Sequence, residues 1–363
     1  MIGSRGLPAA LSGVERVVEE LTVELTALGH EVLIYARPWY LRKQSRLTWT
    51  GSGRVITTPG LAGKNTDALS HTASAMWDVL RRNVDVVHVH CAGPALLSFL
   101  PAAASLPITF TVHAPEWDRA RWSRLGKLAL RTGLNCGMKF ASAVSAVSLN
   151  LRDYLADAYN REVEYIPNGV RAVQLRRPDK IGGWGLKTEG YCLYVGRIVQ
   201  EKRLDLLIGA WREMKITVPL VIAGDGRQEP GYEAECKRQA NELVRFVGPQ
   251  FGTELAELYS NAAVVVQPSE LEGMSLVLLE AAAYGRCVVA REMPATRDAL
   301  GDGVVTFAGD SVEALGETIE KCLNDPALRR STGAEAKRRV TEQFSWPVIA
   351  RQYERLYQCA VRR

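Results

Sequence analysis

The chain alternates between short runs of apolar, β-branched residues and longer segments whose apolar residues recur at helical spacing. In the segment 14–28, for example, Val17 and Leu21 fall on one face of the expected helix. Strands that alternate with helices predict parallel sheets, because a parallel connection needs a crossover that a helix supplies. The predicted strands span 31–36, 85–90, 108–113, 141–148, 163–167, 191–196, 219–224, 244–248, 263–268 and 287–290.

This strand-and-helix pattern starts twice, so two doubly wound domains in tandem are the simplest arrangement. At 363 residues the chain is also too long for one ordinary hydrophobic core. A Pro-Asn-Gly turn at 167–169 marks the expected boundary between the two domains. We therefore expect an N-terminal domain over 1–168, a C-terminal domain over 169–343 and a final helix within 344–363.

The composition is that of a soluble globular protein, with 47% hydrophobic and 23% charged residues. The longest apolar stretch, 96–112, is interrupted by Pro101 and Pro107 and is too short to span a membrane. The N-terminal residues lack the pattern of a signal peptide, so we expect a cytoplasmic location. The 7 cysteines are widely spaced and predict neither a disulfide framework nor a metal site.

The formal net charge of +5 does not demand a nucleic-acid partner. It suits a protein that handles phosphates or touches an anionic membrane surface. One basic segment with two tryptophans could lie on such a surface, although an ordinary solvated helix face explains it as well. The segment contains Trp117, Arg119, Arg121, Trp122, Arg124, Lys127 and Arg131.

Ligands of open parallel sheets bind at the carboxyl ends of the strands, where loops run into helices. After the strand at 263–268, the sequence predicts a turn and then a helix that ends at Gly285. Gly273, Met274 and Ser275 are expected in the first turn of that helix. The N–H groups of a first turn have no partner within the helix, so they attract an anion such as a phosphate.

Two glutamates, Glu272 and Glu280, flank the apolar residues of this turn and helix. A carboxylate on an apolar helix face must be hydrated, paired or used. Glu280 would accept hydrogen bonds from ligand hydroxyls, and Glu272 would face another part of the same ligand. A simpler interpretation stays equally open, in which Glu272 complements the helix dipole and Glu280 is a surface side chain.

Arg197 and Lys202 follow the strand at 191–196 and are expected at the same sheet edge. Two cations there can neutralise a diphosphate and stabilise it as a leaving group. Taken alone, such a pair is more often a solvated basic loop.

At the N-terminus, Ser12 and Glu15 predict a capping box and a helix that begins near Gly13. The glycines of this loop do not have the spacing of a dinucleotide-binding loop. Only Met1 and Ile2 precede the loop, so most of a first strand is missing and we expect a truncated sheet edge.

Three histidines lie on predicted strands. His113 ends the strand at 108–113, where it could donate to a sugar hydroxyl or to developing negative charge. A lone histidine is more often a structural hydrogen-bonding group. His88 and His90 share one face of another strand with no third ligand apparent, so a structural role is favoured over a metal site.

These residues lie in motifs that follow one another along the chain: S-R-G-L-P…S-G-V-E-R, T-V-H-A-P-E-W, I-P-N-G-V, V-G-R-I-V-Q-E-K-R-L-D, I-A-G-D-G and E-G-M-S-L-V-L-L-E. In these motifs the chain resembles glycosyltransferase family 4, over nearly its whole length. The resemblance implies the α/β fold called GT-B, with two Rossmann-like domains whose parallel sheets face an interdomain cleft. It also implies that the last helix crosses back to the N-terminal domain.

The resemblance further implies a retaining transfer of a hexose from a UDP, GDP or dTDP sugar to a hydroxyl of a glycan or lipid-linked acceptor. No metal or other cofactor is expected, and the pathway would be surface polysaccharide or cell-envelope biosynthesis at the inner face of the membrane. The implied catalytic residues are His113, Glu272, Arg197 and Lys202. The implied donor-binding residues are Gly13, Arg197, Lys202, Gly224, Gly226, Val247, Glu272, Gly273, Met274, Ser275, Leu276 and Glu280.

Three rival functions fit the sequence less well. A sugar-nucleotide epimerase of the same fold would need acid and base residues around the sugar, and no convincing set is found. A nucleotide-sugar-binding protein without catalysis would fit the short first strand. An NAD(P)-dependent oxidoreductase is least favoured, because the glycine spacing differs and Arg37 follows the strand at 31–36 where an acidic residue is expected.

Overall fold

The computed structural model describes the chain except residues 10–11, 44–50, 62, 64–65, 120–121 and 363. The chain divides into two compact units directly after the Pro-Asn-Gly turn. Unit 1 comprises Met1–Gly169 and Trp346–Arg363, and unit 2 comprises Val170–Ser345. Each unit is an α/β structure with parallel strands, which confirms the predicted fold class.

Unit 2 contains a six-stranded parallel sheet in the order β12-β11-β10-β7-β8-β9. The strand interiors are apolar and buried because helices cover both faces. The chain enters the sheet at β7, builds β8 and β9 on one side, and then returns to place β10 on the other. The strands are β7 (Cys192–Val195), β8 (Leu220–Ala223), β9 (Val244–Phe246), β10 (Val264–Gln267), β11 (Cys287–Arg291) and β12 (Val305–Phe307).

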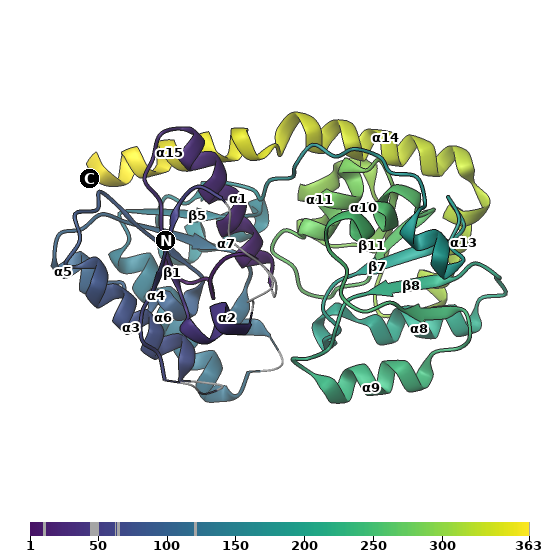
Figure 1. Cartoon of the computed structure of the whole chain (residues 1–363), viewed down its shortest axis with the longest axis horizontal. Coiled ribbons are helices and arrows are strands. Elements are labelled where there is room, and N and C mark those ends of the chain that lie inside the picture. The colour runs from purple at the N-terminus through teal and green to yellow at the C-terminus, as the bar shows by residue number, and fades with distance from the viewer. Residues whose placement is uncertain (10–11, 44–50, 62, 64–65, 120–121, 363) are drawn as a thin grey trace. The chain divides into compact units, whose positions relative to one another are not determined.

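Figure 1 shows α8 and α9 on one side of this sheet and α10 and α11 on the other. Trp211 on α8 and Ile319 on α13 belong to the core beneath the sheet. The helices of unit 2 are α8 (Leu204–Glu213), α9 (Pro230–Gln239), α10 (Gly252–Asn261), α11 (Leu276–Ala283), α12 (Pro294–Leu300), α13 (Val312–Asn324) and α14 (Pro326–Gln343), with 3-10 turns η2 (Lys180–Trp184), η3 (Gln200–Lys202) and η4 (Gly301–Gly303).

Unit 1 contains parallel strands in the orders β1-β2 and β3-β4-β5-β6, and the first two residues join these two groups. The N–H of Ile2 donates to the carbonyl of His88 (2.9 Å), and the N–H of Tyr35 donates to the carbonyl of Met1 (3.1 Å). Met1 and Ile2 therefore lie inside the sheet, so the expectation of a truncated edge is wrong. The strands are β1 (Leu33–Ala36), β2 (Arg54–Thr57), β3 (Val87–His90), β4 (Ile108–Val112), β5 (Ala143–Ala146) and β6 (Glu164–Tyr165).

Helices also cover both faces of the unit 1 sheet. Figure 1 shows α1 and α15 along one face and α3, α4 and α6 along the other. The last helix, α15, packs on α1, β4 and β5. The helices are α1 (Gly13–Ala27), α2 (Pro38–Lys43), α3 (Asp67–Val79), α4 (Ala92–Ala95), α5 (Phe99–Ala103), α6 (Arg124–Phe140), α7 (Leu149–Tyr159) and α15 (Trp346–Arg362), with the 3-10 turn η1 (Glu116–Asp118).

The predicted capping box at the start of α1 is present. The side chain of Ser12 accepts from the N–H of Glu15, and the N–H of Ser12 donates to Glu15 Oε2 (3.2 Å). The helix begins at Gly13, as the sequence predicts.

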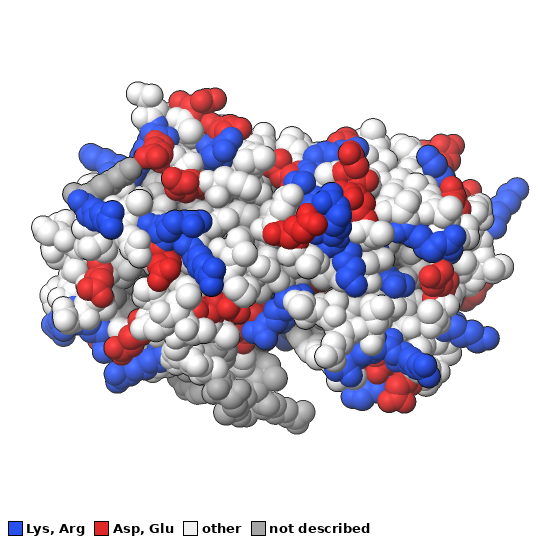
Figure 2. Space-filling view, turned by 90° about the horizontal axis from the view of Figure 1, so that it is seen from above, with Lys and Arg blue, Asp and Glu red and all other residues white. Residues whose placement is uncertain are grey.

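The composition led to expectations about surface charge, membrane-spanning segments and disulfides, and the structure can be compared with each. On the face shown in Figure 2, Lys and Arg side chains are interspersed with Asp and Glu. Within the described part of the chain, no helix combines the length and the apolarity that crossing a membrane requires. All seven cysteines are free thiols, as their spacing predicts.

We expect Gly333→Ala to lower the free energy of unfolding by about 1–3 kcal/mol. A Cβ on Gly333 of α14 would lie 2.4 Å from the carbonyl oxygen of Gly285, the residue just beyond α11. Chemical denaturation measures the change. Gly231→Ala in α9 is the matched control, because its Cβ would meet nothing within 4 Å and the change should be neutral or mildly stabilising. Equal stability of the two variants would contradict the close packing of α14 on Gly285.

Candidate functional site

The topology of unit 2 brings two loops to one point of the sheet. β7 lies between β10 and β8, so the chain direction across the sheet reverses between β7 and β10. In parallel sheets such a switch point opens a ligand crevice at the carboxyl ends of the strands. The loop after β7 carries Arg197 and Lys202, and the loop after β10 carries Glu272.

Lys202 and Glu272 form an ion pair across these two loops, with each side chain only 13% exposed. Gln267, the last residue of β10, also faces this carboxylate. Its Nε2 donates to Ser269 Oγ (2.9 Å) and lies 3.5 Å from Glu272 Oε1. Sequence reasoning missed Gln267, although an amide at the end of an otherwise apolar strand was the signal for it. The structure therefore unites Glu272 with Lys202 and gives that carboxylate a second neighbour.

Arg197 is likewise held by polar neighbours. Its Nη1 donates to Gln228 Oε1 (2.8 Å) and its Nη2 donates to Glu201 Oε1 (3.0 Å). The backbone N–H of Glu270 donates to the carbonyl of Glu201 (3.1 Å) and thereby joins the loop after β10 to the loop after β7. The two predicted cations are thus balanced by carboxylates on the same pair of loops. Neither Glu201 nor Gln228 was predicted.

Arg203 also contacts residues that follow β10 and β12. Arg203 adopts a left-handed backbone conformation (φ 50°) directly after Lys202. Its Nη1 lies 2.6 Å from Asp310 Oδ1 and 3.5 Å from Glu270 Oε2. The loops that carry Lys202 and Glu272 are therefore fixed by two separate ionic contacts.

Glu280 lies on α11 and is half-buried rather than fully exposed. Its Oε2 accepts a hydrogen bond from the hydroxyl of Tyr259 (3.0 Å), whose ring stacks on Tyr284 at a centroid distance of 5.4 Å. An oriented carboxylate at the sheet edge suits the reception of ligand hydroxyls better than a mobile surface side chain would. The sequence did not predict Tyr259 as the hydrogen-bond partner of Glu280.

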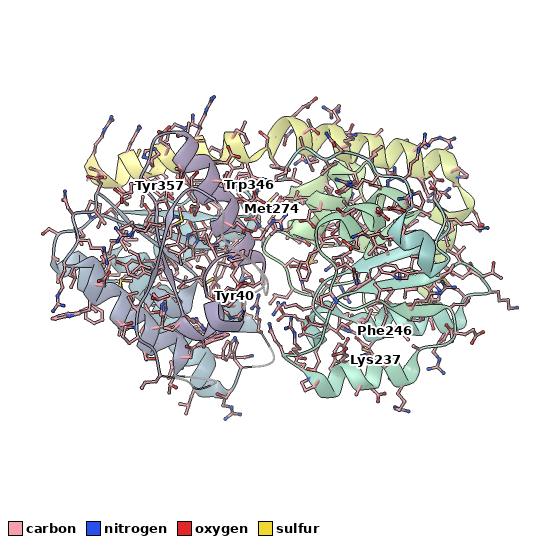
Figure 3. The ribbon with its side chains drawn as sticks, in the orientation of Figure 1. Tyr40, Lys237, Phe246, Met274, Trp346 and Tyr357 are labelled. Atoms are coloured by element: carbon pink, nitrogen blue, oxygen red, sulfur yellow. The ribbon has the colours of Figure 1, made fainter. Side chains whose placement is uncertain are left out.

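The start of α11 differs from the prediction. Ser275 is the N-cap with extended backbone angles, and the first helical residue is Leu276. Gly273, Met274 and Ser275 therefore precede the helix rather than form its first turn. The Ser275 side chain makes no capping hydrogen bond, and the apolar run alone did not define where helical angles begin. Met274, labelled in Figure 3, is buried, as are Gly273 and Ser275.

The loops after β8 and β9 lie side by side. The N–H of Gly224 donates to the carbonyl of Gly248 (3.0 Å), and the N–H of Val247 donates to the carbonyl of Ile222 (3.0 Å). A Cβ on Gly224 would lie 1.8 Å from the carbonyl oxygen of Gly196, so only glycine allows this approach to the loop after β7. The structure thus brings together the two segments that carry the predicted residues Gly224, Gly226 and Val247. The N–H of Gly226 donates to Glu233 Oε2 (2.9 Å).

The remaining predicted residues, Gly13 and His113, belong to unit 1. Gly13 is exposed at the first position of α1, and among the described residues no hydrogen bond joins it to His113. His113 Nε2 lies 3.0 Å from Nδ1 of His90. Pairing of β3 with β4 brings His113 beside His90, a neighbour that the sequence did not reveal. Burial lowers the pKa of His113 to about 4.

His88 has the structural role that the sequence favoured. Its Nε2 lies 2.7 Å from Thr111 Oγ1, and its Nδ1 lies 2.8 Å from the hydroxyl of Tyr357 on α15. Burial lowers the pKa values of His88 and His90 well below the usual range, so both rings are neutral. Among the described residues, no group of three or more His, Cys, Asp or Glu side chains is arranged to hold a metal ion.

The basic segment of unit 1 is only partly at the surface. Trp117 is buried and stacks on Tyr154 at a centroid distance of 6.3 Å, so it does not belong to an exposed aromatic face. Arg121 lies outside the described residues. On α6, in contrast, Leu125 and Leu128 are 78% and 61% exposed.

Two family models match this chain. The model described as Glycosyltransferase Family 4 matches residues 11–173, and the model described as Glycosyl transferases group 1 matches residues 177–339. Between them the two models span most of the chain.

Curated relatives and solved structures align with this chain over nearly its whole length. The chain is 27% identical to a glycogen synthase of Mycobacterium tuberculosis, covering 98% of this chain and 93% of the relative. It is 29% identical to a D-inositol 3-phosphate glycosyltransferase of Frankia alni, covering 96% and 95%. Among solved structures, sucrose-phosphate synthase from Thermosynechococcus elongatus superposes with a TM-score of 0.81 at 20% identity, covering 98% and 97%. The Anabaena protein HepE, solved with UDP-glucose, gives a TM-score of 0.79 at 18% identity, covering 96% of each chain. These neighbours share the GT-B fold.

The ion pair between Lys202 and Glu272 should contribute measurably to the stability of unit 2. We expect Lys202→Met and Glu272→Leu each to lower the free energy of unfolding by about 1–3 kcal/mol, because each leaves a partly buried charge without its partner. The double variant should lose less than the sum of the two. Chemical denaturation of all four proteins gives the coupling energy.

The matched control is the ion pair between Lys180 and Glu254 in the same unit, whose side chains are 52% and 31% exposed. Lys180→Met and Glu254→Leu should couple weakly, since exposed ion pairs contribute about 0–1 kcal/mol. Equal coupling in the two cycles would show that the pair at the sheet edge is only a surface contact.

Proposed function

Because the chain belongs to glycosyltransferase family 4, we propose that it transfers a hexose from a nucleoside-diphosphate sugar to a hydroxyl of a glycan or lipid-linked acceptor. The observation that carries the proposal is the ion pair between Lys202 and Glu272, which joins the two loops at the switch point between β7 and β10. The setting would be surface polysaccharide or cell-envelope biosynthesis. The solved complex of HepE with UDP-glucose supports a nucleotide-sugar donor, which would be a UDP, GDP or dTDP hexose.

The donor diphosphate would bind by exchanging ionic partners. Lys202 is paired with Glu272, and Arg197 with Glu201, on the two loops that meet at the switch point. A diphosphate brings several negative charges to both cations at once and forms short, charge-assisted hydrogen bonds with them. When Lys202 turns to the phosphate, the carboxylate of Glu272 becomes available to accept hydrogen bonds from the sugar hydroxyls. Phosphate binding and sugar binding are thereby coupled.

The nucleoside would be held by its ribose. Tyr259 orients the Glu280 carboxylate through a hydrogen bond of 3.0 Å. A carboxylate accepts two hydrogen bonds from neighbouring hydroxyls, which is the arrangement that a vicinal diol offers. The base would lie near the loops at 224–227 and 247–249, where Gly224 and Gly248 bring two chain segments together.

The transfer would proceed on one face of the sugar. The bond between the anomeric carbon and the diphosphate oxygen breaks, the acceptor oxygen bonds to the same carbon from the same side, and its proton passes to a diphosphate oxygen. Arg197 and Lys202 would stabilise the charge of the leaving diphosphate, as Mg²⁺ does in metal-dependent enzymes. Isolation of a covalent adduct between the sugar and a carboxylate of the protein would contradict this single-step mechanism.

Helix α6 offers a surface for the membrane that would hold a lipid-linked acceptor. Leu125 and Leu128 form an exposed apolar stripe one turn apart, and Arg124, Lys127 and Arg131 lie beside it on the same helix. Leucines that enter the interface next to cations that meet anionic headgroups are the two elements of peripheral membrane binding. We propose that α6 rests on an anionic bilayer.

The nucleotide clamp is tested by calorimetric titration of UDP, GDP, dTDP, ADP and NAD into the wild type and into Glu280→Ala. We expect one nucleoside diphosphate to bind and the variant to lose about tenfold or more in affinity, since hydrogen bonds to a charged group contribute about 1.5–3 kcal/mol. Glu317→Ala, a change of an exposed glutamate on α13, is the matched control and should bind normally.

Equal affinity of Glu280→Ala and the wild type would remove the proposed role of Glu280. If a nucleotide sugar binds but no sugar is transferred to any acceptor or to water, the chain is a binding protein without catalysis. If the sugar changes configuration while it stays attached to the nucleotide, the chain is an epimerase.

The membrane surface is tested by co-sedimentation with vesicles of phosphatidylglycerol and phosphatidylcholine. We expect the wild type to bind the anionic vesicles and the double variant Leu125→Asp/Leu128→Asp to remain in the supernatant, because each change removes apolar contact and adds repulsion. The matched control is Leu69→Asp/Leu175→Asp, which alters two exposed leucines elsewhere and should bind as the wild type does. Binding that is equal in both double variants would rule out α6 as the docking surface.

A further inference from the structure

A stripe of polar side chains crosses the otherwise apolar interior of unit 1. On β3 and β4, His88 pairs with Thr109 and His90 with Thr111, and residues two apart on a strand point to the same face. Tyr353 and Tyr357 of α15 cover this face, and Thr111 Oγ1 lies 3.4 Å from the Tyr353 hydroxyl. Buried polar side chains are costly unless their hydrogen bonds are satisfied, so this stripe calls for an explanation.

His88 anchors the stripe, because both of its ring nitrogens have hydroxyl partners. Thr111 lies 2.7 Å from one nitrogen and Tyr357 lies 2.8 Å from the other. Tyr357, labelled in Figure 3, comes from the last helix of the chain. With both nitrogens engaged, the plane of the His88 ring is fixed. The ring of His90 packs against it at a centroid distance of 3.9 Å with an interplanar angle of 34°, which restricts His90 as well.

Among the described residues, only one ring nitrogen of His90 has a hydrogen-bond partner. Its Nδ1 lies 3.0 Å from Nε2 of His113, whereas its own Nε2 is buried without any hydrogen-bond partner. Both rings are neutral, so each carries one proton on one of its two nitrogens. One of the two facing nitrogens must therefore be the donor and the other the acceptor.

The two assignments differ in what they leave buried. If His113 Nε2 carried the proton and donated, His90 would carry its proton on Nε2, where a buried N–H would have no acceptor. If His90 Nδ1 donates instead, its Nε2 is left with only an unused lone pair. Orphaned buried N–H groups are the rarer and more costly of the two defects. The second assignment is therefore the more stable one.

We infer that His90 is a positioning residue that holds His113 as the tautomer protonated on Nδ1, so that this N–H, and not Nε2, is offered to the substrate. Among the described residues, Nδ1 of His113 has no hydrogen-bond partner and is not fully buried. The role toward substrate rests on the proposed function, whereas the tautomer does not.

The assignment restricts what His113 can do. A neutral imidazole whose Nε2 is already engaged has no free lone pair, so it cannot take a proton from the acceptor hydroxyl. It can donate one hydrogen bond through Nδ1 to a sugar hydroxyl or to an oxygen that gains negative charge. Tyr357 contacts His88, His88 contacts His90, and His90 contacts His113. The position of α15, which carries Tyr357, therefore helps to fix the direction of the His113 N–H.

The tautomer is read from long-range ¹H–¹⁵N correlation spectra of the ligand-free, histidine-labelled protein at neutral pH, because protonated and bare ring nitrogens differ in ¹⁵N shift. The chain has 5 histidines, so single His→Gln variants assign the signals. We expect Nδ1 of both His90 and His113 to be protonated. His90→Asn keeps an N–H donor near the position of Nδ1 and should preserve the His113 tautomer, whereas His90→Leu should let His113 exchange between both forms.

Kinetics test the consequence for transfer. We expect His90→Leu to lower kcat roughly tenfold or more, the size of one hydrogen bond lost from the transition state, with little change in nucleotide affinity. His90→Asn should recover most of the lost kcat. His30→Gln, a change of the exposed histidine that contacts Glu354, is the control and should leave kcat unchanged.

A wild-type spectrum with the proton of His113 on Nε2 would overturn the inference. So would an unchanged kcat in His90→Leu with the tautomer lost, since His113 would then act regardless of its proton. A protein that shows the expected tautomer but transfers no sugar would overturn the proposed function alone. The two failures are therefore distinguishable.

Discussion

The carboxyl edge of the unit 2 sheet is governed by one electrostatic constraint, which is that a partly buried charge must have a partner even when no ligand is bound. Lys202 meets Glu272, Arg197 meets Glu201, and the carboxylate of Glu280 accepts from Tyr259. An unpaired charge at such a position is costly, so these contacts stabilise the loops and α11 before any ligand is bound. The site is thus assembled by the same charges that it would use.

Unit 1 stabilises its buried polar side chains in a different way. Its histidines at the sheet face are neutral, because burial lowers their pKa values, and they interact through directed hydrogen bonds rather than through charge. A network of neutral rings can fix the direction of its hydrogen bonds. Each ring has one donor and one acceptor, so the role of each ring restricts the role of the next. Ion pairs tolerate rotation and exchange, whereas the stripe from Tyr357 to His113 does not. The two units therefore provide exchangeable charge in one case and a fixed donor in the other.

The sequence was sufficient wherever the signal was local. The strands follow from apolar runs, and the capping box follows from Ser12 and Glu15, three positions apart. The start of α11 was misplaced because an apolar run does not show where helical angles begin. The partners of the site residues were out of reach, since Lys202 and Glu272 are 70 positions apart and only the order of strands in the sheet brings them together. The roles inferred for them from family resemblance stay predictions.

The pairing of charges also bears on which ligand the unit 2 edge would select. A ligand with a single negative charge can engage one cation and release one carboxylate. Such a ligand would gain little binding free energy, because one ion pair replaces another. A diphosphate would engage Arg197 and Lys202 together, both on the loop after β7, and would release two carboxylates, of which Glu272 could then bind the attached sugar. The binding free energy should therefore become more favourable as the ligand adds a diphosphate, a sugar and a nucleoside. On the proposed function, discrimination against free phosphate and against a bare nucleoside follows from the ion pairs that hold the empty site in place.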